Sequence, residues 1–418
     1  MTWGFTMTCS FTMTCRSALA LVPVLAGLVA TAPAQDTITV LRGARVLIGT
    51  GQAIENGVVT MAGGKIVAVG DAKLEVPGGA VIVDCAGKVI TPGLVDASTT
   101  LGIAGDVNEQ GDEITAAVSV LDALDPRDKG LARALRAGVT TVQVNPGNKN
   151  VIGGLGAVVK TFGESAERML VREDSGLRLT MGAEPSGGNR ASRGGTPASI
   201  YYRRPTTRMG VVWETRQAFY RAIAYQEQKT IPGAPPPPVD ADLEVLLRAL
   251  RGELIVRTTA RAEQDIRTAI RLANEFGYKT VLDESTEAWS VLDAIVAANV
   301  PVLLAAPSRG IAGDGAEVRW ATARLLAQRG VPFAICSGAD AGALDLGREA
   351  MFAVRFGLDP SIALRSVTSE AARLLAVEDR VGSLSAGLDA DVVLWSGDPF
   401  DPTSSVVSVW VGGRRVVP

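Results

Sequence analysis

The second half of the chain alternates between predicted helices and short, almost wholly apolar strands, and no other feature of the sequence constrains the fold as much. The predicted helices cover residues 263–276, 286–298, 318–328 and 346–356, and strands such as PVLLAA (301–306) and PFAICS (332–337) lie between them. Strands buried on both faces and linked through helices are typical of a parallel sheet. Since the connections are short, we expect a closed (β/α)₈ barrel.

The two ends of the chain follow a different pattern, in which apolar residues recur every second position between Gly-containing turns. This pattern covers 37–83 and returns at 390–417, where Val407, Val409 and Val411 alternate. Both ends therefore predict strands of one small composite β-sandwich domain. With 418 residues, 47% of them hydrophobic, the chain can bury cores for this domain and a barrel. The predicted boundaries are 35–92 and 385–418 for the β domain and 93–384 for the barrel, with an insert at 182–240.

The first 34 residues resemble an export signal. Arg16 precedes an apolar run at 18–30, and Ala32-Pro33-Ala34 matches a cleavage pattern. We therefore expect a secreted or periplasmic protein with no stable membrane span after cleavage, and an uncleaved N-terminal anchor is the alternative. The repeated FTMTC suggests a true start at Met7 or Met13. Cys85 and Cys336, the two cysteines beyond the signal, are predicted to be small core residues.

The composition excludes several classes of function. The chain contains no histidine, which removes the usual nitrogen ligand of zinc together with Ser-His-Asp and Cys-His catalytic systems. A formal net charge of −3 shows no excess of basic residues of the kind that nucleic-acid-binding proteins carry. Any hydrolysis by this chain therefore needs a carboxylate or a lysine with a strongly shifted pKa.

Three segments carry a resemblance to a known family. They are DCAGKVITPGLVDASTT (84–100), NPGNKNVIGGLGAVVKT (145–161) and SEAARLLAVEDRVGSLSAGLDADVVLWSGDPF (369–400), of which the last is the most specific. They resemble the amidohydrolase superfamily, in its imidazolonepropionase-like branch. The resemblance implies a (β/α)₈ barrel and metal-dependent hydrolysis of C–N bonds, usually with zinc.

At the positions where the family carries its metal ligands, this chain has other residues. Ser98 and Thr100 stand in place of the His-x-His pair that ends the first barrel strand, and Glu284 stands in place of a later ligand histidine. A segment that includes 258–260 also lacks an expected histidine. Hydroxyl groups are poor replacements for imidazole, so we expect a degenerate member with no metal and no cofactor.

The resemblance assigns vestigial catalytic positions to two further residues. Lys160 matches the lysine that forms a carboxylated metal bridge in related hydrolases, and Asp340 matches an aspartate that binds metal and relays protons. We expect Lys160, Glu284 and Asp340 to meet at the barrel mouth, where active sites of this fold collect. They form either a metal-free ion cluster, in which the ammonium replaces the lost cation, or an oxygen-ligand site for Mg²⁺ or Mn²⁺ with a carboxylated Lys160.

The insert at 182–240 is rich in Gly, Ser, Arg and Pro. Its arginines at 190, 193, 203, 204 and 208 predict a lid that faces an anionic group, and a solvated surface excursion is the alternative. From this set Arg208, together with Glu284, is the candidate for substrate binding.

Two functional hypotheses follow. The first is an exported pseudo-hydrolase that binds a small amide or peptide, or serves as the partner subunit of an active amidohydrolase paralogue. The second is an active hydrolase of non-peptide C–N bonds, dipeptides or cyclic amides that uses a site without histidine.

Overall fold

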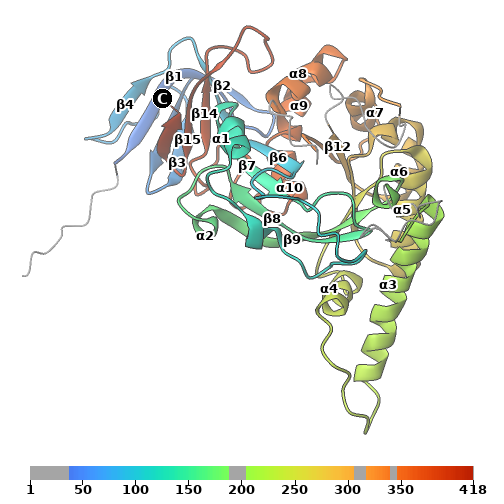
Figure 1. Ribbon diagram of the computed structural model, residues 1–418. Helices are drawn as coiled ribbons and strands as arrows, with labels where there is room; N and C mark the ends of the chain where they lie inside the picture. The colour runs from blue at the N-terminus through green and yellow to red at the C-terminus, as the bar shows by residue number, and fades with distance from the viewer. Residues whose placement is uncertain (1–36, 188–203, 306–316, 339–345, 418) are drawn as a thin grey trace, which may run out of the picture. The chain divides into compact units, whose positions relative to one another are not determined.

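The computed structural model describes residues 37–187, 204–305, 317–338 and 346–417. Within them, strands from the two ends of the chain share one sheet. Its strands are β1 (Thr39–Leu47), β2 (Ala53–Ala62), β3 (Lys65–Gly70), β4 (Val81–Asp84), β5 (Val89–Pro92), β14 (Val392–Trp395), β15 (Val406–Val411) and β16 (Arg414–Val417). Figure 1 shows the blue N-terminal and dark red C-terminal strands side by side.

The order in this sheet is β16-β15-β14-β5-β1-β2-β3, with β4 also paired to β1. The antiparallel pairing of β14 with β5, from Val392 opposite Pro92 to Trp395 opposite Val89, joins the two ends of the chain. Its core contains Leu41, Ile90 and Trp410. In β1, the buried Ala44 and Val46 alternate with more exposed neighbours, as the period-two pattern predicted, whereas β5 and β14 are buried throughout.

The second sheet is the barrel. Its strands are β6 (Leu94–Thr99), β7 (Val139–Val144), β8 (Ile152–Lys160), β9 (Leu170–Thr180), β10 (Val256–Thr259), β11 (Thr280–Asp283), β12 (Val302–Ala305) and β13 (Phe333–Cys336). They are hydrogen-bonded in sequence order. The ends nearly close on each other, because Thr99 bridges Gly338 and the Gly338 N–H donates to the Ser98 carbonyl over 2.9 Å. The expected α/β barrel with a separate β-rich domain is confirmed.

One strand departs from the expected all-parallel arrangement. β8 runs antiparallel to both of its neighbours, with Thr141 opposite Lys160 and Ile152 opposite Leu179. The segment 145–151 between β7 and β8 contains no helix, and a parallel return needs a crossover of a dozen or more residues. β8 therefore returns as a hairpin, and its last residue lies at the end of the barrel where the other strands begin.

Helices cover the barrel and plug one of its ends. The helices are α1 (Lys129–Arg136), α2 (Ala166–Met169), α3 (Arg208–Lys229), α4 (Ala241–Leu250), α5 (Glu263–Phe276), α6 (Leu292–Ala298), α7 (Thr322–Gln328), α8 (Leu346–Arg355), α9 (Pro360–Ser366) and α10 (Ser369–Leu374). Short 3₁₀ turns lie at Val120–Ala123, Glu184–Ser186 and Thr286–Ser290. Ala371 and Ala372 of α10 pack in one cluster with Val95, Val281 and Ala334 of the barrel strands.

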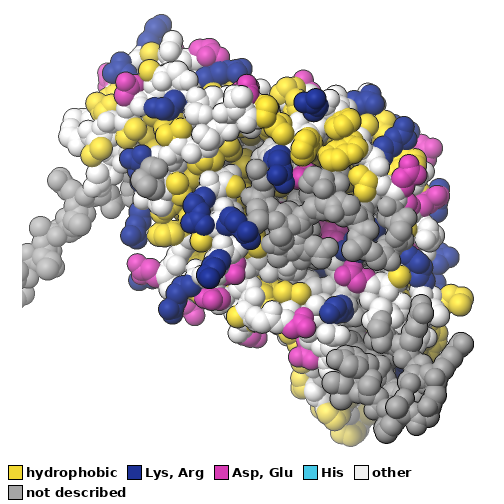
Figure 2. Space-filling view, turned by 45° about the horizontal axis from the view of Figure 1, so that its top comes forward, with side chains coloured by type: hydrophobic (Ala, Val, Ile, Leu, Met, Phe, Trp, Pro, Cys, Tyr) yellow, Lys and Arg dark blue, Asp and Glu magenta, His cyan; other side chains and the backbone are white. Residues whose placement is uncertain are grey.

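Several sequence predictions for local structure agree with these elements. α5 has the predicted bounds, and Cys85 and Cys336 are buried free thiols. None of the described helices is both long and apolar enough to cross a lipid bilayer. The face in Figure 2 intersperses Lys and Arg with Asp and Glu, in keeping with the small net charge.

Candidate functional site

The carboxyl ends of the parallel barrel strands bring four polar side chains together at one end of the barrel. Ser98 lies on β6, Arg178 near the end of β9, and Asp283 and Glu284 at the end of β11. All four are at most 2% exposed. Glu284 has a φ of 52°, a left-handed conformation that few non-glycine residues adopt and that often marks a functional site.

Arg178 lies at the centre of this mouth. Its Nη1 donates to Asp283 Oδ2, and its Nη2 donates to Glu284 Oε1 over 2.9 Å. Its Nε and Nη2 also donate to Asn148 Oδ1, over 3.0 and 2.6 Å. Burial of a guanidinium is costly unless it is paired and hydrogen-bonded, and Arg178 meets both conditions. It supplies the positive charge that two buried carboxylates need.

A second guanidinium group contacts the other carboxylate oxygen of Glu284. Arg261, 6% exposed, donates from Nε to Glu284 Oε2 over 3.0 Å and from Nη2 to the same oxygen, and its Nη1 donates to Glu184. Burial alone lowers the pKa of Arg261, but Glu284 and Glu184 outweigh it and raise that pKa above its ordinary value. Glu284 therefore lies between two guanidinium groups, an arrangement that favours the charged form of a carboxylate.

The hydroxyl groups at the expected ligand positions take part in the same network. Ser98 Oγ donates to Asp283 Oδ2 over 2.9 Å and accepts from Asn145 Nδ2 over 3.0 Å. Thr259 Oγ1 donates to Asn148 Oδ1 over 3.1 Å, and Thr100 is 4% exposed. Ser98 and Thr259 thus have hydrogen-bond partners within the protein, whereas Asp283 Oδ1 has none among the described residues.

These residues do not fit the metal centre that the resemblance implies. The two carboxylates of the mouth, Asp283 and Glu284, already bind guanidinium groups, and Ser98 and Thr100 offer un-ionised hydroxyls. Within the described ranges, no three His, Cys, Asp or Glu side chains form a cluster able to hold a metal. Asp340 lies outside the described residues.

Lys160 lies at the opposite end of the barrel, so the expectation that it joins Glu284 at the mouth is wrong. The reversed direction of β8 causes the difference. Lys160 Nζ lies 2.5 Å from Asp391 Oδ2 and 3.0 Å from Asp389 Oδ2, where the last barrel helix leads back to the β domain. Burial raises the pKa of Asp389, but Lys160, with Lys65 and Arg380, outweighs it and lowers that pKa to about 2.

Arg208 lies outside the barrel, where its Nε contacts Asp265 Oδ2 at 3.3 Å. It lines a cavity of about 330 Å³ with Met181, Val212 and Arg271, between α3 and the start of α5. Among the described residues, Arg208 thus pairs with Asp265, whereas Glu284 pairs with Arg178 and Arg261. Arg204 donates its backbone N–H to Glu113 over 2.9 Å, and the lid arginines 190, 193 and 203 lie outside the described residues.

Two further buried ionisable groups were missed in the sequence. Arg257, which is 0% exposed, crosses the barrel from β10 to the opposite strand β6, where Nη1 donates to the Ala97 carbonyl over 3.2 Å. Among the described residues its Nε and Nη2 have no hydrogen-bond partner, and burial lowers its pKa to about 10. Burial also raises the pKa of Asp96 to about 6, against opposing hydrogen bonds from Ser337 and Ser98. Single charged residues inside apolar strands were the available signal.

Fold and site together define a class: an α/β barrel whose mouth holds arginine–carboxylate pairs. Residues 265–416 match the model of the amidohydrolase family. The chain is 31% identical to the crystal structure of an amidohydrolase from Thermotoga maritima MSB8, covering 90% of this chain and 99% of that one with a TM-score of 0.82. The protein therefore belongs to the amidohydrolase family, whose members are hydrolases acting on C–N bonds and are usually metal-dependent.

Two other relatives extend the comparison. Amidohydrolase tasK of Hapsidospora irregularis is 28% identical over 406 residues, which cover 86% of this chain and 39% of that protein. The chain thus spans well under half the length of this relative. A Xaa-Pro dipeptidase crystallised with methionine in its active site is 15% identical, with a TM-score of 0.58 over 91% of this chain and 100% of that one, and shares the fold.

Proposed function

We propose that this protein is an exported, catalytically silent member of the amidohydrolase family that retains its barrel as a binding module. The observation that carries the proposal is the position of Glu284 between Arg178 and Arg261. A guanidinium stays protonated at all physiological pH values and offers no open coordination position. It therefore satisfies the carboxylates without activating water or polarising an amide.

The same reasoning extends to the role of the protein in an assembly. A barrel that cannot hydrolyse its ligand can still bind a small amide or peptide, or pair with an active paralogue. The match to a relative more than twice as long supports the second role, because in that protein a segment of this kind is covalently joined to further sequence. Co-expression with a histidine-containing paralogue, followed by size-exclusion chromatography, tests this role, and we expect a hetero-oligomer.

Metal analysis of the purified full chain tests catalytic silence. We expect well under one equivalent of bound Zn²⁺ or Mn²⁺ per chain after incubation and dialysis, and no turnover of a panel of dipeptides and lactams. Stoichiometric metal together with turnover that Asp340→Ala abolishes would refute the proposal. As a matched pair, Arg178→Ala frees the mouth carboxylates, whereas Arg172→Ala changes an arginine of the same strand whose Nη1 binds the Leu375 carbonyl.

One observation favours the alternative of a hydrolase without histidine. Asp96 is 3% exposed and has a pKa of about 6, within the range that a general base needs near neutral pH. Under this alternative, activity rises with pH through about 6, and Asp96→Asn removes both the activity and the inflection. A flat, background-level profile for both proteins would exclude it.

A further inference from the structure

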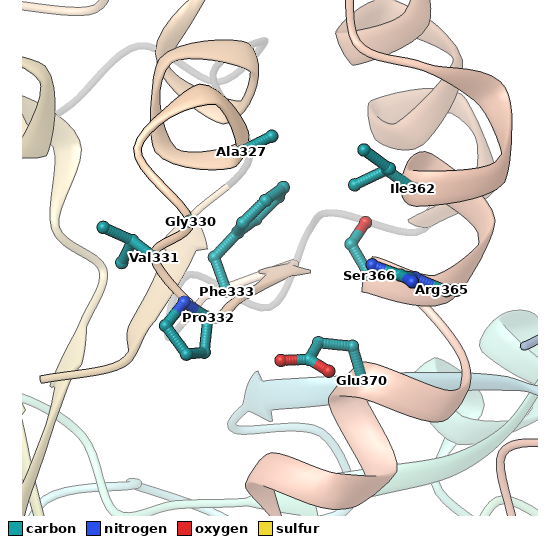
Figure 3. Close-up of a pocket in the computed structure, with 9 residues that line it drawn as sticks. All are labelled: Ala327, Gly330, Val331, Pro332, Phe333, Ile362, Arg365, Ser366 and Glu370. Carbon is teal, nitrogen blue, oxygen red and sulfur yellow. The ribbon is translucent and has the colours of Figure 1, made fainter. Parts of the chain in front are cut away.

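A cavity of about 210 Å³ opens at the end of the barrel opposite the mouth. It lies between the last turn of α7, the start of β13, and helices α9 and α10 (Figure 3). Pro332 and Phe333 stand at its floor, where β13 begins. The cavity shares no residue with the arginine–carboxylate network of the mouth.

The lining is divided into an apolar and a polar side. Figure 3 shows the Phe333 ring directed towards Ile362, with Val331 and Pro332 on the same side of the cavity. The polar side chains come from α9 and α10, on the other side. These polar residues are Arg365, Ser366 and Glu370. A ligand that fits this division has an aliphatic body and a polar head.

The two charged residues of the lining, Arg365 and Glu370, indicate which polar groups the ligand carries. Arg365 is exposed and, within the described residues, makes no side-chain hydrogen bond or ion pair, so its fork of donors is available to a carboxylate. Glu370 accepts from Arg373 Nη2 over 2.5 Å and from Arg373 Nε over 3.1 Å. A carboxylate has about four lone-pair positions, so Glu370 retains the capacity to accept from an ammonium group.

We propose that this cavity binds a small aliphatic amino acid. The α-carboxylate pairs with Arg365, the α-ammonium donates to Glu370, and a branched side chain packs on Phe333 and Ile362. The volume is below the roughly 300 Å³ at which drug-sized pockets begin, which favours a ligand of this size. The proposal is independent of whether the barrel mouth is catalytic.

Ligand-observed NMR titration of the full chain with L-leucine tests the proposal. Two analogues separate the contacts: 4-methylpentanoate lacks the ammonium group, and isopentylamine lacks the carboxylate. For a ligand of this size we expect a Kd on the order of 0.1–1 mM. Each analogue should bind at least about tenfold more weakly than leucine, because each loses one charge-assisted contact.

Matched variants assign the contacts to residues. Arg365→Gln should weaken leucine and 4-methylpentanoate about tenfold and leave isopentylamine unchanged, whereas Glu370→Gln should do the reverse for the two analogues. Arg355→Gln and Glu378→Gln, at exposed positions outside the lining, should leave all three unchanged. Absence of leucine binding, or binding that neither Arg365→Gln nor Glu370→Gln weakens, would overturn the proposal.

Discussion

Replacement of Arg257 by methionine should stabilise the protein. Arg257 is fully buried, and its Nε and Nη2 have no partner in the part of the chain that the structure describes. Each buried unsatisfied donor costs about 1–3 kcal/mol, against about 1 kcal/mol from the hydrogen bond of Nη1 to the Ala97 carbonyl. The Arg257 side chain passes close to Gly176, where a Cβ on residue 176 would lie only 2.7 Å from Arg257 Cδ. Methionine keeps an unbranched apolar side chain that fits the same space. We expect Arg257→Met to raise the free energy of unfolding by about 1–3 kcal/mol.

The pH of the measurement follows from the lowered pKa of Arg257. Because the folded-state pKa of about 10 lies below the ordinary value of an arginine, the folded state holds its proton less firmly than the unfolded state. The cost of the buried charge is therefore complete below a pH of about 10 and decreases only as the pH rises from there towards that ordinary value. Urea unfolding at pH 7.5, followed by circular dichroism, samples the whole effect.

Arg178→Met is the matched control, since it also removes a fully buried arginine of the barrel. Arg178 pairs with Asp283 and Glu284, so its loss leaves two buried carboxylates without their common cation. We expect a loss of about 3–5 kcal/mol. Destabilisation by Arg257→Met of more than about 1 kcal/mol, or a neutral Arg178→Met, would refute the reasoning that partners, and not burial alone, determine the effect of these arginines.

Three further predictions concern single positions. Lys160→Met should lower the free energy of unfolding by about 3–5 kcal/mol at pH 7 in a urea titration, because it leaves the buried Asp391 carboxylate without its cation. Since the pKa of Asp389 is lowered to about 2, its stabilisation is present above pH 3.8 and is lost as the pH falls towards 2, so acid unfolding of wild type should be steeper than that of Lys160→Met. Asp96→Asn keeps the acceptor oxygen but cannot ionise. Because the pKa of Asp96 is raised to about 6, the free energy of unfolding of wild type should fall by about 1–3 kcal/mol relative to this variant as the pH rises from 4 to 7.5. Thermal melts across that pH range measure the difference. Gly93→Ala places a Cβ 2.0 Å from a hydroxyl of β7 and should lower the thermal midpoint by several degrees, whereas Gly78→Ala, with no atom within 4 Å, should not.

The sequence predicted the elements whose signal is local. α5 was correct at both ends because its apolar residues recur at helical spacing, and one of the expected Gly-containing turns lies at Gly63-Gly64, where both residues adopt positive φ. The pairing of one strand with another, and its direction, has no such local signal in the sequence. The direction of β8 depends on how it pairs with β7 and β9, and that direction alone decides at which end of the barrel Lys160 lies.

The composition of the mouth illustrates the same division. A metal-free ion cluster was one of the two arrangements considered from the sequence, because carboxylates at a barrel mouth need positive charge. Which residue supplies that charge was not available locally, since Arg178 and Glu284 are separated by 106 residues. The prediction named Lys160, whereas the structure places Arg178 and Arg261 against the carboxylates.

An arginine and a metal ion satisfy the same electrostatic condition with different chemical consequences. Either one neutralises Asp283 and Glu284 inside a medium of low dielectric constant, so either is compatible with the inherited barrel. The metal keeps a position open for water or an amide oxygen, whereas the donors of Arg178 are directed at Asp283, Glu284 and Asn148. Under the proposed function, in which arginine takes the place of the metal, the substitution would preserve the fold and remove the Lewis acid. For this reason the family membership of the chain and the chemistry of its mouth are separate questions.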